Sequence, residues 1–240
     1  MTVARNNQQQ TNSTTGSTTY TLASYAVPSG TDRVLVVVAH LQRSSDSTYT
    51  ASCTFNGGAM TEAVTQYQGG SSRGFRTYIW YLIAPAVVTA NIVVTSSAAL
   101  QGAIVSAVTL TDAHQSNVLG AIDGDVTTPI NSLGLTGTVS GSMIIAAVTS
   151  HSGASPSWTW ATATEDYDLN NGNDSAEVAG SVAHYSVPSG GNVTITAERS
   201  ASIAQSGVAA EFKPAATSGV NRANRRLLRQ GTQRGVRAGF

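Results

Sequence analysis

At 240 residues the chain is long enough for one large β domain or two small ones, and 41% hydrophobic residues can build a core. Charged residues make up only 11%, against the ~25% usual for soluble proteins, and the net charge is zero. The single cysteine, Cys53, excludes an internal disulfide. The best apolar run, residues 79–88, is about half the ~20 residues that a membrane-spanning helix needs, and the N-terminus lacks a secretory signal pattern. We therefore expect no membrane partner.

The first 17 residues are rich in Asn, Gln, Ser and Thr without apolar periodicity, which predicts a flexible N-terminal arm. The continuous β-branched run at residues 33–40 predicts a strand covered on both faces. Residues 50–55 alternate between apolar and polar and lead into Asn56-Gly57, a strong short hairpin signal.

Residues 76–84 predict a strand that is apolar on both faces. One face carries Tyr78, Trp80 and Leu82, and the other carries Ile79, Tyr81 and Ile83. A central strand covered twice is the favoured interpretation, and an aromatic patch facing an interface is the alternative. Further strands are expected at 91–95 and 102–111.

The segment at residues 76–97 has an inexact echo at 176–200, in which Pro188 corresponds to Pro85. Strands elsewhere in the second half follow the same order as in the first. The repeat therefore predicts an internally duplicated chain.

From this spacing of strands and turns we expect an all-β fold: an antiparallel β-sandwich, jelly-roll-like or formed from two fused immunoglobulin-like halves. The halves would span residues 18–112 and 133–214. Residues 113–132 show no strong pattern and are interpreted as a linker.

Three segments are distinctive beyond their strand pattern: FNGGAMT at 55–61, IWYLIAP at 79–85 and AAEFKP at 209–214. Together with VLVVVAH and NIVVTSS, they resemble the β-sandwich proteins common in tailed-phage genomes and in bacterial genomes that carry phage genes. The resemblance covers about residues 18–214, and its motifs are architectural, with no catalytic residue to transfer. It implies a phage structural or accessory protein without fixing its place on the particle.

The C-terminal tail, residues 215–240, is rich in arginine. Through residue 219 the chain has seven basic and thirteen acidic residues, a balance of −6, and the remainder carries +6. Four arginines are spaced i, i+3, i+4 and i+7, which would place them on one helical face. Docking on protein carboxylates is the favoured interpretation, with a disordered tail as the alternative; nucleic acid is disfavoured because no aromatic residues are interleaved. The candidate binding residues are Arg222, Arg225, Arg226, Arg229, Arg234, Arg237 and Phe240.

The segment 166–177 places oxygen-bearing side chains at positions 1, 3, 5, 9 and 12 of a calcium-loop pattern. Because strands and not helices are expected to flank it, a solvated acidic turn is the favoured interpretation and calcium the alternative; no other cofactor is expected. The calcium ligands would be Asp166, Asp168, Asn170, Asp174 and Glu177.

Two further residue pairs have alternative interpretations. Trp158 and Trp160 share one face of a predicted strand, as aromatic platforms for sugars do, but core packing is favoured. His40 and His151 end corresponding strands, which we interpret as a trace of the duplication and not as a metal pair. No acid/base pair or nucleophile constellation can be assembled, so we do not expect an enzyme.

These features favour a virion structural protein: a capsid decoration, cement or head-fibre component. Its terminal arms would attach it to other virion proteins, and it would be present in many copies or as a homo-oligomer. A carbohydrate-binding module of a tail fibre or cell-surface adhesin is the alternative.

Overall fold

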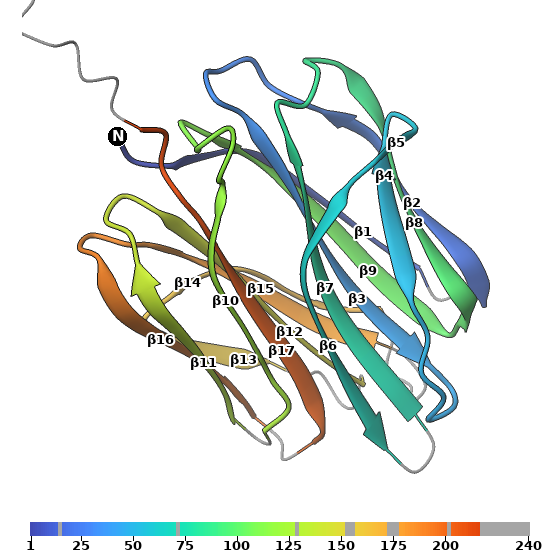
Figure 1. Cartoon of the computed structure of the whole chain (residues 1–240). Coiled ribbons are helices and arrows are strands. Elements are labelled where there is room, and N and C mark those ends of the chain that lie inside the picture. Colours follow the sequence, from blue (N-terminus) through green and yellow to red (C-terminus); the bar gives the residue numbers. More distant parts are fainter. Residues whose placement is uncertain are drawn as a thin grey trace, which may run out of the picture.

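The computed structural model describes residues 1–13, 16–70, 73–127, 130–151, 157–171, 178–200 and 203–216. The regular structure in these residues consists of antiparallel β-sheets, which confirms the expected all-β sandwich (Figure 1). Within the same residues, no helix has the length and hydropathy of a membrane span.

The first half of the chain forms a five-stranded sheet with the order β1-β9-β3-β7-β6 and a four-stranded sheet with the order β2-β8-β4-β5. The strands are β1 (Ala4–Ser13), β2 (Ser17–Ala26), β3 (Val34–Arg43), β4 (Ala51–Phe55), β5 (Gly58–Ala59), β6 (Thr61–Gly70), β7 (Arg73–Ile83), β8 (Thr89–Leu100) and β9 (Gly102–Thr111).

The second half repeats this plan with the orders β10-β17-β12-β15-β14 and β11-β16-β13. Its strands are β10 (Leu119–Asp125), β11 (Ile130–Thr138), β12 (Met143–His151), β13 (Trp158–Ala161), β14 (Thr164–Asn170), β15 (Val178–Ser186), β16 (Gly191–Arg199) and β17 (Gln205–Phe212). In the two five-stranded sheets, β1, β9, β3, β7 and β6 occupy the same places as β10, β17, β12, β15 and β14. The predicted duplication is therefore confirmed.

In the two edge strands β6 and β14, the two halves match residue by residue. A β-bulge separates Glu62 from Val64 in β6, and another separates Glu165 from Tyr167 in β14, at matching registers against β7 and β15. Both glutamates are exposed. A bulge and a charge on an edge strand oppose pairing with a foreign strand, so both edges are protected in the same way.

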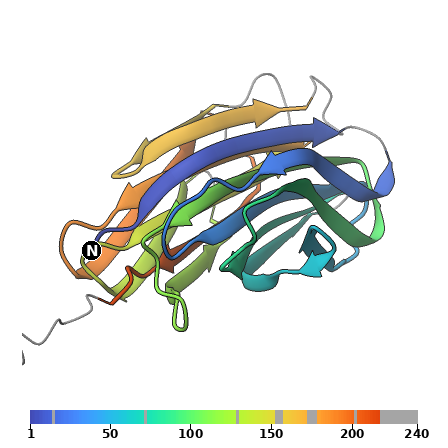
Figure 2. The same ribbon diagram turned by 90° about the horizontal axis from the view of Figure 1, so that it is seen from above.

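The four sheets form four layers. The five-stranded sheets face each other in the middle, and each is covered on its outer side by the smaller sheet of its own half (Figures 1 and 2). Alternate side chains of β3 therefore enter different cores: Val36 packs in the central core with Ile145, and Val37 packs in the outer core with Ile92. The halves thus share one central core and have an outer core each.

The predictions for the first half's central strands are confirmed. In β7, Tyr78 and Trp80 pack in the outer core and Ile79 in the central core, so both faces of the strand are covered. Asn56 and Gly57 have φ values of 49° and 76° and form the turn between β4 and β5. Positive φ at both positions is what the type I′ turn of a two-residue hairpin requires.

The flexible N-terminal arm is a wrong prediction for residues 4–13, which form β1 and pair with β9 over nine residue pairs. No side chain of β1 is buried. Apolar periodicity identifies only strands that bury side chains, and β1 is held by its backbone ladder and polar contacts. Figure 2 shows it in dark blue, along one side of the molecule.

One further prediction is corrected in the second half. The linker at 113–132 contains β10, which pairs with β17, and the start of β11, which pairs with β16. In addition, Asp123 and Asp125 accept hydrogen bonds from the β11 backbone amides of Gly134 (2.6 Å) and Ser132 (2.7 Å). These carboxylates replace the apolar contacts that would have marked a strand in the sequence.

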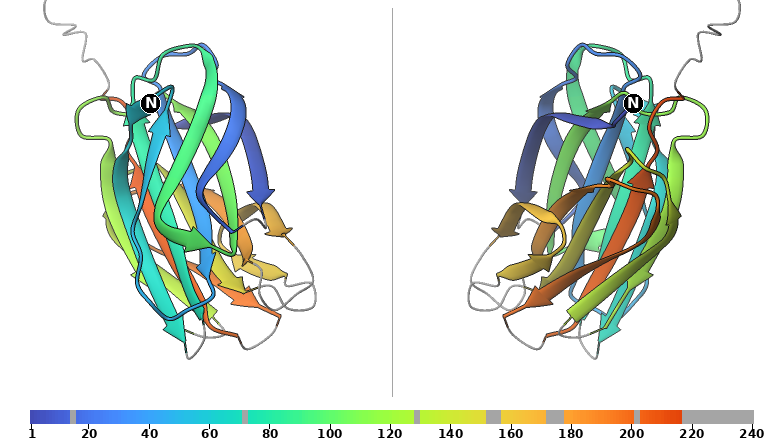
Figure 3. Two further views of the ribbon diagram at one scale, coloured as in Figure 1. Left: turned by 90° about the vertical axis from the view of Figure 1, so that its right-hand side faces the viewer. Right: turned by 90° about the vertical axis from the view of Figure 1, so that its left-hand side faces the viewer.

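The two halves run in the same direction, so their turns meet at one end. The turns after β2, β7, β9, β11 and β15 lie at this end together with the N-terminus (Figure 3). Val3 N–H donates to Gly141 O at 2.8 Å, and the bridge between Ala113 and Pro214 brings the last described residues to the same place. We call it the terminal end.

Candidate functional site

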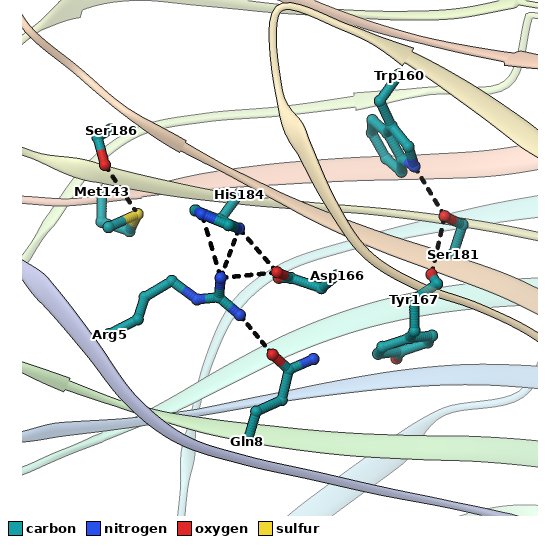
Figure 4. A network of polar contacts seen from close by, with 9 residues as sticks. All are labelled: Arg5, Gln8, Met143, Trp160, Asp166, Tyr167, Ser181, His184 and Ser186. Atoms are coloured by element: carbon teal, nitrogen blue, oxygen red, sulfur yellow. Dashed lines mark hydrogen bonds and ion pairs between the residues drawn. The ribbon is translucent and has the colours of Figure 1, made fainter.

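A charged cluster joins the two halves where β1 passes β14 and β15. Arg5 Nη1 lies 2.7 Å from Asp166 Oδ1, and the same carboxylate oxygen lies 2.8 Å from His184 Nδ1 (Figure 4). The Asp166 side chain is only 5% exposed, and the Arg5 and His184 side chains are about one-fifth exposed. Arg5 also donates to Gln8.

The proton of His184 can be assigned from these contacts. Nδ1 cannot both donate to Asp166 and accept from Arg5, which lies 2.6 Å away. We place the proton on Nδ1, so that it donates to the carboxylate, and Arg5 then has Nε2 as its ring acceptor at 3.1 Å. In this arrangement two donors, Arg5 and His184, share the Asp166 carboxylate, and the cluster contains no nucleophile. We therefore interpret it as a structural ionic contact that joins β1 to β14 and β15.

The duplication places a different set of side chains at the corresponding position. By strand register, Arg5, Asp166 and His184 correspond to Leu119, Ala63 and Tyr81. Those three pack in or against the central core. One side of the molecule is therefore closed by apolar contacts and the other by an ionic cluster.

This comparison gives a prediction. Asp166→Ala leaves Arg5 without its carboxylate and should lower the free energy of unfolding by about 2–3 kcal/mol, less than for a fully buried pair. The triple variant Arg5→Leu/Asp166→Ala/His184→Tyr copies the apolar side and should stay within about 1 kcal/mol of wild type. Urea unfolding measures both, and a triple variant less stable than Asp166→Ala would contradict the prediction.

The calcium pattern begins on a strand and not in a loop, because β14 continues to Asn170. Asp166 is bound to Arg5 and His184, and Asp168 Oδ2 accepts the Trp158 backbone N–H at 3.0 Å. Asp174 and Glu177 lie outside the described residues. Among the described residues, no three His, Cys, Asp or Glu side chains are grouped as a metal site would need.

Because Asp166 is already neutralised by Arg5, we expect calcium to leave the protein's melting temperature unchanged within about 1 °C, since a ligand stabilises only by binding the folded state. Differential scanning calorimetry with millimolar calcium and then with a chelator tests this. A rise with calcium that the chelator reverses, and that Asp168→Asn abolishes, would restore the calcium interpretation.

The tryptophan pair does not form an exposed platform. Both rings lie on one side of β13 as predicted, but Trp158 is only 3% exposed and donates its ring N–H to Gln205 at 2.9 Å. Trp160 is partly buried, and its ring N–H donates to Ser181 Oγ at 2.8 Å. The favoured interpretation, core packing, describes both residues.

The predicted correspondence of His40 with His151 is wrong. His40 lies six residues after Val34, and the residue six after Met143, the partner of Val34 in the repeat, is Thr149. β12 simply extends two residues beyond it. His40 is fully buried between the five-stranded sheets, with Nδ1 2.8 Å from Thr149 Oγ1 and Nε2 3.2 Å from the Tyr167 hydroxyl.

The candidate tail residues Arg222, Arg225, Arg226, Arg229, Arg234, Arg237 and Phe240 lie outside the described residues. What the structure adds is the position from which they start. Lys213 N–H donates to Val118 O at 2.7 Å, and Ala215 N–H donates to Asp112 O at 2.8 Å. The chain is therefore held at the terminal end up to the last described residues.

Comparison with known proteins adds little. No family model matches the chain, and no curated protein matches it. One solved structure, titled "Red Clover Necrotic Mosaic Virus", aligns at 12% identity over 79% of this chain and 82% of that chain. Its TM-score of 0.22 is too low to indicate a shared fold.

Proposed function

We propose that this chain is a structural, non-enzymatic protein of a phage virion: a capsid decoration, cement or head-fibre component present in many copies. The observation that carries the proposal is the separation of an acidic four-layered body from a basic tail. The described body ends at residue 216 at the terminal end, and the sequence then continues into six arginines.

The family resemblance supports the same role. FNGGAMT forms the β4–β5 hairpin, IWYLIAP lies in and just after β7, and AAEFKP ends β17 and leads to the tail. All three segments build the body or its ends, as the resemblance to phage β-sandwich proteins implies.

Attachment in this proposal differs from the sequence-based expectation in one respect. Since residues 4–13 form β1, only the C-terminal tail is left as an attachment arm. Arginine side chains bind carboxylates through two parallel hydrogen bonds, so the tail suits an acidic surface on a neighbouring virion protein.

The test uses phage particles purified from host cells that express the gene for this protein. The full-length protein should band with the particles in a density gradient. A chain truncated after residue 216, and a full-length chain with all six tail arginines changed to glutamine, should both lose at least tenfold in occupancy.

The matched control, Arg43→Gln/Arg73→Gln, removes two charges from the body and should attach as wild type does. Tail variants that attach normally would rule out the tail as the arm. Full-length protein that is absent from the particles would rule out the virion role.

A further inference from the structure

The large apolar side chains that the described surface exposes are unevenly distributed. Six of them are exposed, by between 37% and 59% of their area. Five lie at the terminal end: Met1, Val87, Val88, Ile122 and Val139. Single exposed apolar residues are normal, but a gathering of them at one end indicates an interaction surface. We call these five residues the terminal face.

One group on this face is fixed by a buried carboxylate. Glu211 is 1% exposed, and its oxygens accept the backbone N–H groups of Ala121 at 2.8 Å and Val139 at 2.7 Å. Ile122 and Val139 are thereby held on neighbouring segments. The hydrogen bond from Val3 to Gly141 brings the first residues of the chain, including Met1, beside them.

The second group lies on the turn after β7. Val88 O accepts the Val27 N–H at 3.0 Å, and Pro85 O accepts from the Arg33 guanidinium at 3.2 Å. The turn is therefore tied to the start of β3 and is not a loose loop. Two rigid apolar groups remain uncovered in the described structure.

The last described residues lie at this end, where Lys213 and Ala215 are hydrogen-bonded to Val118 and Asp112. Residues 217–240 follow them in the sequence and contain six arginines and no acidic residue. A partner that covers this end must accept apolar contact and supply negative charge around it. That description fits an apolar protein patch bordered by carboxylates.

We propose that the terminal face is the docking surface of this protein and that its partner is a neighbouring virion subunit with an apolar patch bordered by Asp and Glu side chains. The opposite end of the body then points away from the particle. This inference rests on the proposed virion role and adds to it the orientation of the body and the chemistry of the partner.

The orientation can be tested by thiol labelling. The native Cys53 is 2% exposed and burial raises its pKa to about 12, so it gives a low background. Ser29→Cys places a thiol at the terminal end and Ser47→Cys places one at the opposite end; both positions are exposed. On virions, maleimide labelling should slow at least tenfold at position 29 and stay unchanged at position 47.

Each other outcome decides against part of the proposal. Slower labelling at position 47 alone would overturn the orientation while leaving the virion role intact. Slow labelling at position 29 in the purified protein would show that a second copy or the protein's own tail covers the face; truncation after residue 216 tells these two apart. Absence of both variants from the particles would defeat the virion role itself.

The apolar contribution has a matched control in Val126, the sixth exposed residue, which follows β10 at the opposite end. Val87→Ser/Val88→Ser/Val139→Ser with an intact tail should lower occupancy on virions at least tenfold. Val126→Ser should change it less than twofold. Equal occupancy for both variants, with melting temperatures like that of wild type, would overturn the terminal face as the docking surface.

Discussion

Lowering the pH from 7 to 4 should cost the wild-type protein about 3 kcal/mol more unfolding free energy than it costs a His40→Gln variant. His40 is fully buried between the five-stranded sheets, and desolvation lowers its pKa from 6.5 to about 3, against a smaller opposing effect of a hydrogen bond with the Val148 backbone. In the unfolded chain the imidazole regains its ordinary pKa.

The direction follows from proton binding. Between about pH 6.5 and pH 3, His40 binds a proton in the unfolded state but not in the folded state. The free energy of unfolding therefore falls as the pH falls through this window. Above pH 6.5 both states are neutral and the contribution is complete. Nearby polar groups, Thr149 and the Tyr167 hydroxyl, do not become charged in this range.

Urea unfolding of both proteins at pH 7, 5.5 and 4 measures the effect, because carboxylates that titrate in the same window are common to both. Glutamine keeps a polar group in the cavity. Should the glutamine variant not fold, His40→Asn serves the same purpose. Parallel stability curves for wild type and variant would show that His40 does not titrate as its burial requires.

The parts of the fold that the sequence predicts are those that bury large side chains. The alternation in residues 76–84 marks β7 because both its faces pack in cores, and Asn56-Gly57 marks a hairpin because few other residues adopt positive φ. Strand β1 has no such signal, since its Asn and Gln side chains stay outside the cores.

The charged cluster has no signal in the sequence either. Arg5 and His184 are 179 residues apart and meet only because the two halves pack face to face. Glu211 does have a signal in the sequence. A glutamate inside the apolar strand 205–212 indicates a buried carboxylate that needs hydrogen-bond partners. The sequence does not indicate which partners these are, because Ala121 and Val139 lie on two other segments.

Removing that carboxylate should have the second large effect. Glu211→Ala deprives the Ala121 and Val139 N–H groups of their acceptor at a site that is nearly closed to water. Each orphaned donor costs about 1–3 kcal/mol, so we expect a loss of about 3 kcal/mol of unfolding free energy. Glu211→Gln keeps one carbonyl oxygen and should lose about half as much.

Hydrogen exchange locates the effect. In the alanine variant the amides of Ala121 and Val139 should exchange faster by more than the global loss of stability accounts for, because these two amides lose their acceptor on β17 while β10 stays paired with β17 from Ile122 to Asp125. Thr109 is the counterpart of Glu211 in the first half, where it lies 2.9 Å from the Tyr25 hydroxyl. Thr109→Ala is therefore the matched control. In this variant the amides of Ala121 and Val139 should exchange faster only by the amount that the change in global unfolding free energy accounts for. If the alanine variant at position 211 loses less than about 1 kcal/mol of unfolding free energy, the Glu211 carboxylate is not what holds Ile122 and Val139 in place.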